Sequence, residues 1–231
     1  MELAIDELEE KNEHKIDVAQ LKQYGIVHQR MTLDRGDTAR KPFFFAPHPS
    51  ILEPSEETDD ELRSTLAFED TCFNEPVDRS RQVAGPWSYY IPHDRDDPVY
   101  DYRPYKDLYK HDDPEFGAFG MTDILGKDFP HTKTTMYNGL DATDEIILRG
   151  ELLTILRVML GQLRKVRLHH KKAPVFLVSF AGKRARAFEA YSNGETLFLR
   201  TTKLYNFPEE TSVAYKDLAE WIASSPTGDT S

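Results

Sequence analysis

The residues best suited to hold a ligand are three cations and one aromatic ring on an expected β-hairpin. Segments 184–191 and 195–202 have strand-like composition and flank Asn193-Gly194, a dipeptide typical of two-residue type I′ turns. Because side chains alternate between the two faces of a strand, this turn gathers one set of side chains on a common face. That set consists of Arg184, Arg186, Phe188 and Lys203.

Cations that converge beside an apolar wall repel one another unless an anion lies among them. We therefore predict that Arg184, Arg186 and Lys203, together with Phe188, bind the carboxylate or phosphate of a small anionic ligand. The alternative is internal neutralisation by carboxylates from an earlier part of the chain. Those carboxylates include Asp94, Asp96 and Asp112.

The expected turn also fixes the register of the hairpin. Counting outward from it, Ser192 faces Glu195. On the opposite face, Glu189 and Arg200 become diagonal neighbours, close enough to form an ion pair. Such a pair contributes at most ~1 kcal/mol if it is exposed to solvent.

Histidines and tyrosines between residues 41 and 140 supply the candidate acid–base groups. His93 precedes a run of acidic residues, Tyr90 lies in a Tyr/Pro-rich stretch, and His48 stands between two prolines. These three are our predicted catalytic residues, because imidazole and phenol groups can transfer protons when a pocket holds them. No rule of sequence brings them together in space.

The acidic runs after His93 and His111 could also offer metal ligands. The chain has no His-x-His, His-Glu-x-x-His or paired-cysteine motif, and Asp-rich segments near proline are more typical of turns. We therefore expect no metal site and no cofactor.

The elements that must position these residues lie mainly in the last part of the chain. Apolar residues at three- and four-residue spacing predict a long helix that begins near Asp141 or Thr143 and reaches Val166. Three antiparallel strands and a final helix over 211–223 follow. The expected fold is therefore α+β, with a scaffold over 141–224 in the order helix, three-stranded antiparallel sheet, helix.

The rest of the chain divides into an N-terminal segment, a long arm and a tail within a single domain, residues 1–231. Residues 1–40 are charged and weakly helical, with a short helix between Asp17 and Gly25. Residues 41–140 hold most of the prolines and many tyrosines, which predicts an extended arm packed across the scaffold, with one helix over 60–68. Residues 225–231 form the tail.

Composition narrows the class of protein. The chain carries 40 acidic and 29 basic residues, a net charge of −11, which disfavours binding to nucleic acid. The N-terminus lacks a signal peptide, and no apolar stretch approaches the ~20 residues that cross a bilayer. We expect a soluble protein of the cytoplasm or nucleus, without a membrane partner.

Several motifs of the C-terminal third carry a resemblance to known proteins. The motifs are Pro174-Val175-Phe176-Leu177-Val178-Ser179-Phe180, Arg186-Ala187-Phe188-Glu189-Ala190-Tyr191, Lys203-Leu204-Tyr205 and Ser225-Pro226-Thr227-Gly228-Asp229-Thr230. Through them, Glu151–Thr230 resembles a family of uncharacterised proteins from filamentous fungi, which implies a fungal intracellular protein but no particular activity.

The helix–three-strand–helix order is also similar to the core of restriction-endonuclease-like nucleases. That family holds Mg²⁺ with an acid at the start of the second strand and a Glu-x-Lys pattern in the third. Arg184 and Leu197-Phe198-Leu199 stand at those places here. The resemblance therefore implies a degenerate fold without nuclease activity.

Three functional hypotheses follow. The first is a protein that binds a small anionic ligand, either without catalysis or as a fungal metabolic tailoring enzyme. The second is a non-catalytic interaction or regulatory module that binds a protein partner through the Tyr/Pro-rich surface. The third is the degenerate nuclease-like fold.

Overall fold

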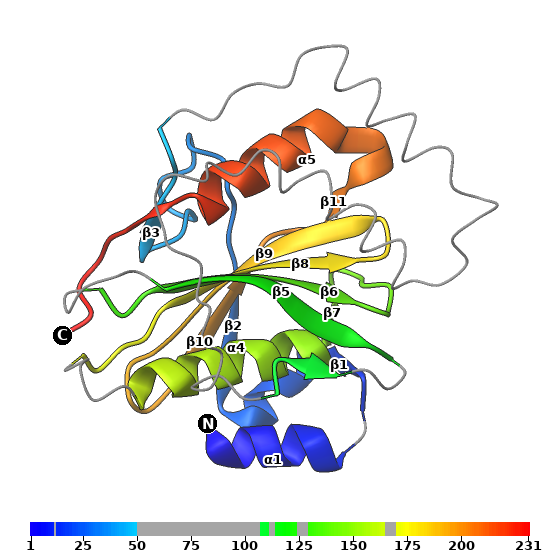
Figure 1. The fold of residues 1–231 in the computed structure, drawn as a ribbon, viewed down its shortest axis with the longest axis vertical. Helices are drawn as coiled ribbons and strands as arrows, with labels where there is room; N and C mark the ends of the chain where they lie inside the picture. The colour runs from blue at the N-terminus through cyan, green and yellow to red at the C-terminus, as the bar shows by residue number, and fades with distance from the viewer. Residues whose placement is uncertain (12, 50–106, 111–113, 124–128, 165–169) are drawn as a thin grey trace.

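A computed structural model describes residues 1–11, 13–49, 107–110, 114–123, 129–164 and 170–231. In chain order, the elements are α1 (Glu2–Glu10), β1 (Lys15–Asp17), the 3₁₀ helix η1 (Gln20–Tyr24), β2 (Ile26–Arg30), β3 (Phe45–Ala46), β4 (Tyr109–Lys110), β5 (Phe116–Asp123), β6 (Thr132–Asn138), β7 (Ile146–Leu148), α4 (Arg149–Leu163), β8 (Val175–Ala181), β9 (Arg184–Ser192), β10 (Leu197–Thr201), β11 (Tyr205–Asn206), α5 (Phe207–Ile222) and β12 (Ser225–Pro226). A large sheet lies between α5 on one face and α4 with α1 on the other (Figure 1).

The sheet is mixed and has eight strands. Its order is β2-β10-β9-β8-β6-β5-β4, and β11 pairs with β9 beside this path. β2 runs parallel to β10 and β6 runs parallel to β8, whereas the other pairs are antiparallel. The predicted three-stranded antiparallel sheet is therefore wrong as a complete sheet, although β8, β9 and β10 do form an antiparallel set within it.

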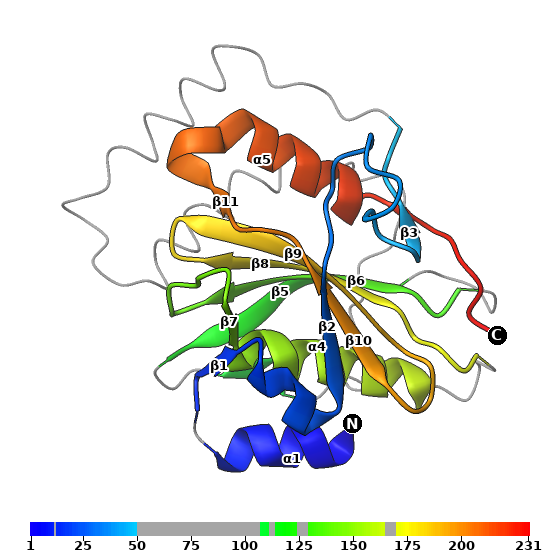
Figure 2. The ribbon, with the colours of Figure 1, turned by 180° about the vertical axis from the view of Figure 1, so that it is seen from behind.

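The additional strands come from segments that we assigned to the N-terminal segment and the arm. β2 lies at the edge next to β10, as Figure 2 shows from behind, and β5 and β6 extend the sheet beyond β8. The interpretation of 41–140 as an arm packed over a scaffold is wrong for β4, β5 and β6. The helix expected over 60–68 lies outside the described residues.

Two apolar cores hold the layers together, one on each face of the sheet. Alternate residues of β8 point to opposite sides, so Leu177 packs with α4 and Phe176 packs with α5. Leu152 and Leu156 on α4 and Trp221 on α5 are fully buried in these cores. Both faces of the central strands are covered, which explains why β8 is an unbroken apolar run.

The hairpin of β9 and β10 forms, but its register differs from the prediction by two residues. Ser192 pairs with Leu197 instead of Glu195, because residues 193–196 form the loop. Gly194 has a φ of +97°, whereas Asn193 does not have the positive φ that a type I′ turn needs. The side-chain oxygen of Asn193 instead accepts hydrogen bonds from the amides of Glu195 and Thr196. A shift of two residues leaves the side chains of β9 and β10 on their predicted faces, whereas Lys203 lies beyond the end of β10.

The new register places Glu189 directly opposite Arg200. Their side chains are 0% and 2% exposed, and Arg200 Nη1 lies 2.7 Å from Glu189 Oε2. Glu189 also accepts hydrogen bonds from the amides of Phe43 and Phe44. This ion pair therefore lies in the interior, where it ties the segment before β3 to the sheet.

The helices begin at different residues from those predicted. α4 begins at Arg149, because Ile146–Leu148 form β7 and pair with β1. The expected N-caps Asp141 and Thr143 are wrong, and Glu151 Oε2 instead accepts the Leu148 amide at 2.8 Å. α5 begins at Phe207 instead of residue 211. Among the described residues, no helix has the length and apolar character needed to cross a membrane.

Candidate functional site

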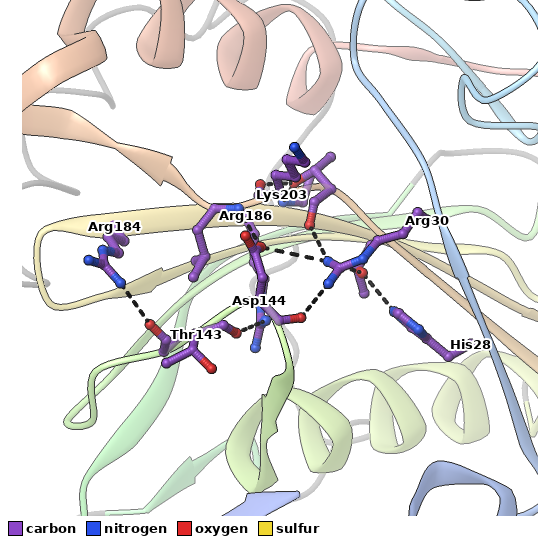
Figure 3. A network of polar contacts seen from close by, with 12 residues as sticks. His28, Arg30, Thr143, Asp144, Arg184, Arg186 and Lys203 are labelled. Atoms are coloured by element: carbon purple, nitrogen blue, oxygen red, sulfur yellow. Dashed lines mark hydrogen bonds and ion pairs between the residues drawn. The ribbon is translucent and has the colours of Figure 1, made fainter. Parts of the chain in front are cut away.

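The predicted cationic cluster faces backbone carbonyl groups. Figure 3 shows Arg184, Arg186 and Arg30 reaching toward the segment 142–144. The hydrogen bonds run from Arg184 Nη1 to the Ala142 carbonyl at 3.3 Å, from Arg186 Nη1 to the Thr143 carbonyl at 3.1 Å, and from Arg30 Nη2 to the Asp144 carbonyl at 2.5 Å. Three arginines from β2 and β9 thus hold three consecutive peptide groups of the segment that leads toward β7 and α4.

Arg186 forms a buried ion pair with Glu151. Its Nε and Nη2 atoms donate to Oε1 and Oε2 of Glu151 at 3.1 and 2.5 Å, and both side chains are 0% exposed. The guanidinium carbon lies 5.0 Å from the centroid of the Phe188 ring, which is also fully buried. Two of the four residues that we predicted for ligand binding therefore belong to the interior beneath α4.

The other two predicted residues, Arg184 and Lys203, are exposed. The Asp144 carboxylate accepts a hydrogen bond from the amide of Leu204, the residue after Lys203, at 3.0 Å, and Arg30 Nη1 lies 3.7 Å from this carboxylate. Anion binding by the cluster stays a prediction. Arg186 has a carboxylate partner in Glu151, and both Arg184 and Arg186 have carbonyl acceptors. The carboxylates of the alternative interpretation, Asp94, Asp96 and Asp112, lie outside the described residues.

His28 adds a titratable group to the same network, which the sequence did not single out. Its Nε2 lies 2.8 Å from the hydroxyl of Thr201. Burial, together with the charges of Arg30 and Arg186, lowers the pKa of His28 to about 4. The imidazole is therefore neutral at pH 7. A polar residue at the inward-facing position of an edge strand was the signal that could have identified it.

The predicted catalytic residues lie partly outside the described chain. His93 and Tyr90 fall in 50–106, as does most of the Tyr/Pro-rich surface predicted to bind a partner. His48 is described, and its backbone amide donates to the Glu220 carbonyl at 2.8 Å. Its own carbonyl accepts from Arg35 Nη2 at 2.5 Å, which places His48 beside α5.

A cavity of about 480 Å³ opens next to His48, between α5 and the segment 33–49. Its lining residues are Leu33, Asp34, Arg35, Pro49, Lys216, Asp217 and Glu220. This volume falls within the range of ~300–1,000 Å³ that is typical of small-molecule sites. The lining is mainly polar and carries three carboxylates and two cations, so it suits a charged ligand.

The charged side chains that line the cavity differ in their partners. Arg35 Nε lies 3.0 Å from Glu220 Oε2, and the Glu220 side chain is only 9% exposed. Burial raises the pKa of Asp217, and the carboxylates of Glu220 and Asp34 raise it further. A hydrogen bond from the Tyr205 hydroxyl at 3.1 Å opposes this shift, as does the charge of Lys216. A positive charge placed beside Asp217 would therefore stabilise its carboxylate.

Comparison of the chain with protein-family models, with curated proteins and with solved structures finds no match. The resemblance of Glu151–Thr230 to a fungal family stays a prediction, as does the similarity to degenerate nucleases.

Within the described ranges, no three histidine, cysteine or acidic side chains are grouped in a way that could hold a metal ion.

Proposed function

We propose that this protein binds a small zwitterionic molecule, such as an amino acid or another amine-bearing organic acid, in the cavity beside α5. The proposal rests on one observation: the partly desolvated carboxylate of Asp217 lines a cavity of about 480 Å³ together with two further carboxylates. A ligand ammonium group beside Asp217 and Asp34 would offset their mutual repulsion.

The opposite end of the ligand would be anionic. Lys216 and Arg35 line the same cavity, and they supply the positive charge that a ligand carboxylate or phosphate needs. The small anionic ligand inferred from the sequence is thus narrowed to a molecule that carries both charges, and its place moves from the β9–β10 hairpin to α5. Catalysis is not part of the proposal.

A panel of amino acids and amine-bearing acids tests this proposal by thermal shift, followed by calorimetric titration of the hits. A ligand at a hundred times its Kd adds about 2.7 kcal/mol of stability, which raises the Tm of a chain of this size by roughly 5–10 °C. We expect such a rise in the wild type and its loss in Asp217→Asn, which keeps the shape but removes the charge.

Glu195→Gln is the matched control, because Glu195 is an exposed carboxylate in the hairpin loop. It should keep the full thermal shift. A shift that survives Asp217→Asn, or an absence of binding across the whole panel, would overturn the proposal.

A further inference from the structure

The C-terminal segment Ser224–Ser231 is docked on the body of the protein as an extra strand. β12 pairs antiparallel with β3, so that Ser225 lies opposite Ala46, and the amide of Thr227 continues the pairing to the Phe44 carbonyl at 2.9 Å. In Figure 1 this segment leaves the end of α5 and passes β3 to reach the C-terminus. The segment keeps this position only if other contacts hold it against β3.

Four basic side chains hold the segment by hydrogen bonds. Two come from the region of β6 and two from the segment that precedes β8. They are Lys133, which donates to the Ser224 carbonyl at 2.9 Å; His131, whose Nε2 bonds the Thr227 carbonyl at 2.9 Å; Lys172, which donates to the Asp229 carbonyl at 3.0 Å; and His170, whose Nδ1 lies 2.8 Å from the Thr230 hydroxyl. Two of the four anchors are therefore histidines.

His131 is the most deeply buried of these anchors. It is 1% exposed, and the rings of Phe44, Phe45 and Phe129 surround it at centroid distances of 6.2, 5.3 and 6.2 Å. A carbonyl oxygen can only accept, so Nε2 carries the hydrogen and Nδ1 is left as a bare nitrogen. Nδ1 is buried and forms no hydrogen bond of acceptable geometry.

The surroundings of His131 disfavour a second proton. Burial lowers its pKa to about 4, and the charges of His170 and Lys133 act in the same direction. The carbonyls of Thr227 and Phe44 favour the charged ring but offset only part of this effect.

Lys172 and Asp229 bring one positive and one negative side chain to the end of the docked segment. Lys171 and Lys172 donate their backbone amides to the Thr230 carbonyl, and the ammonium group of Lys172 donates to the Asp229 carbonyl. The carboxylate of Asp229 is engaged by the amide and hydroxyl of Ser231. A proton taken up by His131 would stand near the cation of Lys133.

We propose that the C-terminal segment is an acid-sensitive strand, docked at neutral pH and released from β3 when the buried His131 that holds it takes up a proton. Release exposes the aromatic rings around His131 and leaves the eight-stranded sheet folded. This pH-dependent release does not involve the ligand cavity.

The sign and size of the effect follow from linkage. A histidine whose pKa is lowered by docking stabilises the docked state. This stabilisation has its full size above pH 6.5, the pKa of the free side chain, and is lost as the pH falls toward 4. With these two values, the ratio of released to docked segment rises about 25-fold between pH 7.5 and pH 5.

Amide hydrogen exchange of the full chain, measured by NMR and corrected for intrinsic rates, tests this proposal. The Thr227 amide reports docking, and the amide of Leu177 in β8 reports global unfolding. We expect protection at Thr227 to fall about 25-fold from pH 7.5 to pH 5 and to lie well below that at Leu177 at both pH values, because Leu177 exchanges only on global unfolding.

The matched variants are His131→Phe and His28→Phe. Both histidines have a pKa of about 4, although His28 is only half-buried, and of the two only His131 contacts the C-terminal segment. His131→Phe should flatten the response of Thr227, whereas His28→Phe should preserve it. His131→Gln, which keeps a donor for the Thr227 carbonyl, serves if the phenylalanine variant fails to fold.

Three results would overturn the proposal. The first is constant protection at Thr227 in the wild type, and the second is equal protection at Thr227 and Leu177, which would mean that Thr227 exchanges only by global unfolding. The third is a full pH response in the variant that lacks His131.

Discussion

Replacing Arg186 distinguishes a structural role of the basic cluster from a ligand-binding role. Arg186→Met retains much of the aliphatic volume but leaves the Glu151 carboxylate without its partner, in a position where both side chains are 0% exposed. Removing one member of a buried ion pair typically costs about 3–5 kcal/mol, because the remaining charge stays desolvated. For a chain of this size, that loss corresponds to a Tm lower by roughly 6–20 °C.

The double variant Arg186→Met/Glu151→Met gives the sharper result. It leaves no unpaired charge and loses only the bonds to the Thr143 carbonyl and the Leu148 amide, about 0.5–1.5 kcal/mol each. We therefore expect it to be more stable than either single variant. The coupling energy between the two positions should be at least ~3 kcal/mol.

Urea unfolding followed by circular dichroism measures all four proteins of this cycle. Arg184→Met is the control, because Arg184 lies on the same strand face but is exposed, and it should cost less than about 1 kcal/mol. The reasoning is refuted if Arg186→Met is as stable as the wild type, or if the double variant is no better than the worse single one.

Two other substitutions test contacts that fix the fold. Glu189→Gln removes the charge of the second buried ion pair and weakens the acceptor for the amides of 43–44, so we expect a loss of about 2–4 kcal/mol in urea unfolding and faster amide exchange at 43–44. Gly182 has a φ of +63°, and a Cβ there would lie 2.1 Å from Asp141 Oδ1, so Gly182→Ala should lower the free energy of unfolding by about 1–3 kcal/mol. Gly194→Ala isolates the backbone component, since Gly194 also has positive φ but nothing lies within 4 Å, and a loss equal to that of Gly182→Ala would contradict the steric argument.

The sequence predicts β8, β9, β10, α4 and α5 because each carries a strong local pattern. β8 is a continuous apolar run, and α4 repeats apolar residues at helical spacing. β6 has no such pattern: its sequence Thr-Lys-Thr-Thr-Met-Tyr-Asn is largely polar, yet all seven residues are buried. Its parallel pairing with β8 depends on residues about forty positions away, which no window of local periodicity includes.

The edge strand β2 illustrates the same limit over a longer range. It pairs with β10 across more than 160 residues of sequence, and its pattern of one buried residue followed by partly exposed ones is too weak to indicate a strand. Contacts of this kind become visible only when the chain is folded, because the partner strand supplies the hydrogen bonds that define the element.

The partners of the candidate site residues were hard to predict for a related reason. Charged side chains can be counted in a sequence, but the partial negative charges of backbone carbonyls cannot, and these are what Arg184, Arg186 and Arg30 contact. A cluster of cations therefore predicts an anion only if no loop presents its carbonyls there. The two arginines of β9 differ in burial. Arg186 lies two residues further along the strand than Arg184, and it forms a fully buried ion pair, whereas the Arg184 side chain is exposed. The carboxylate of Asp217 differs from these buried ion pairs. It is partly desolvated and lies near other carboxylates, but it borders a cavity instead of a buried cation, which makes it the better candidate for a ligand-binding group.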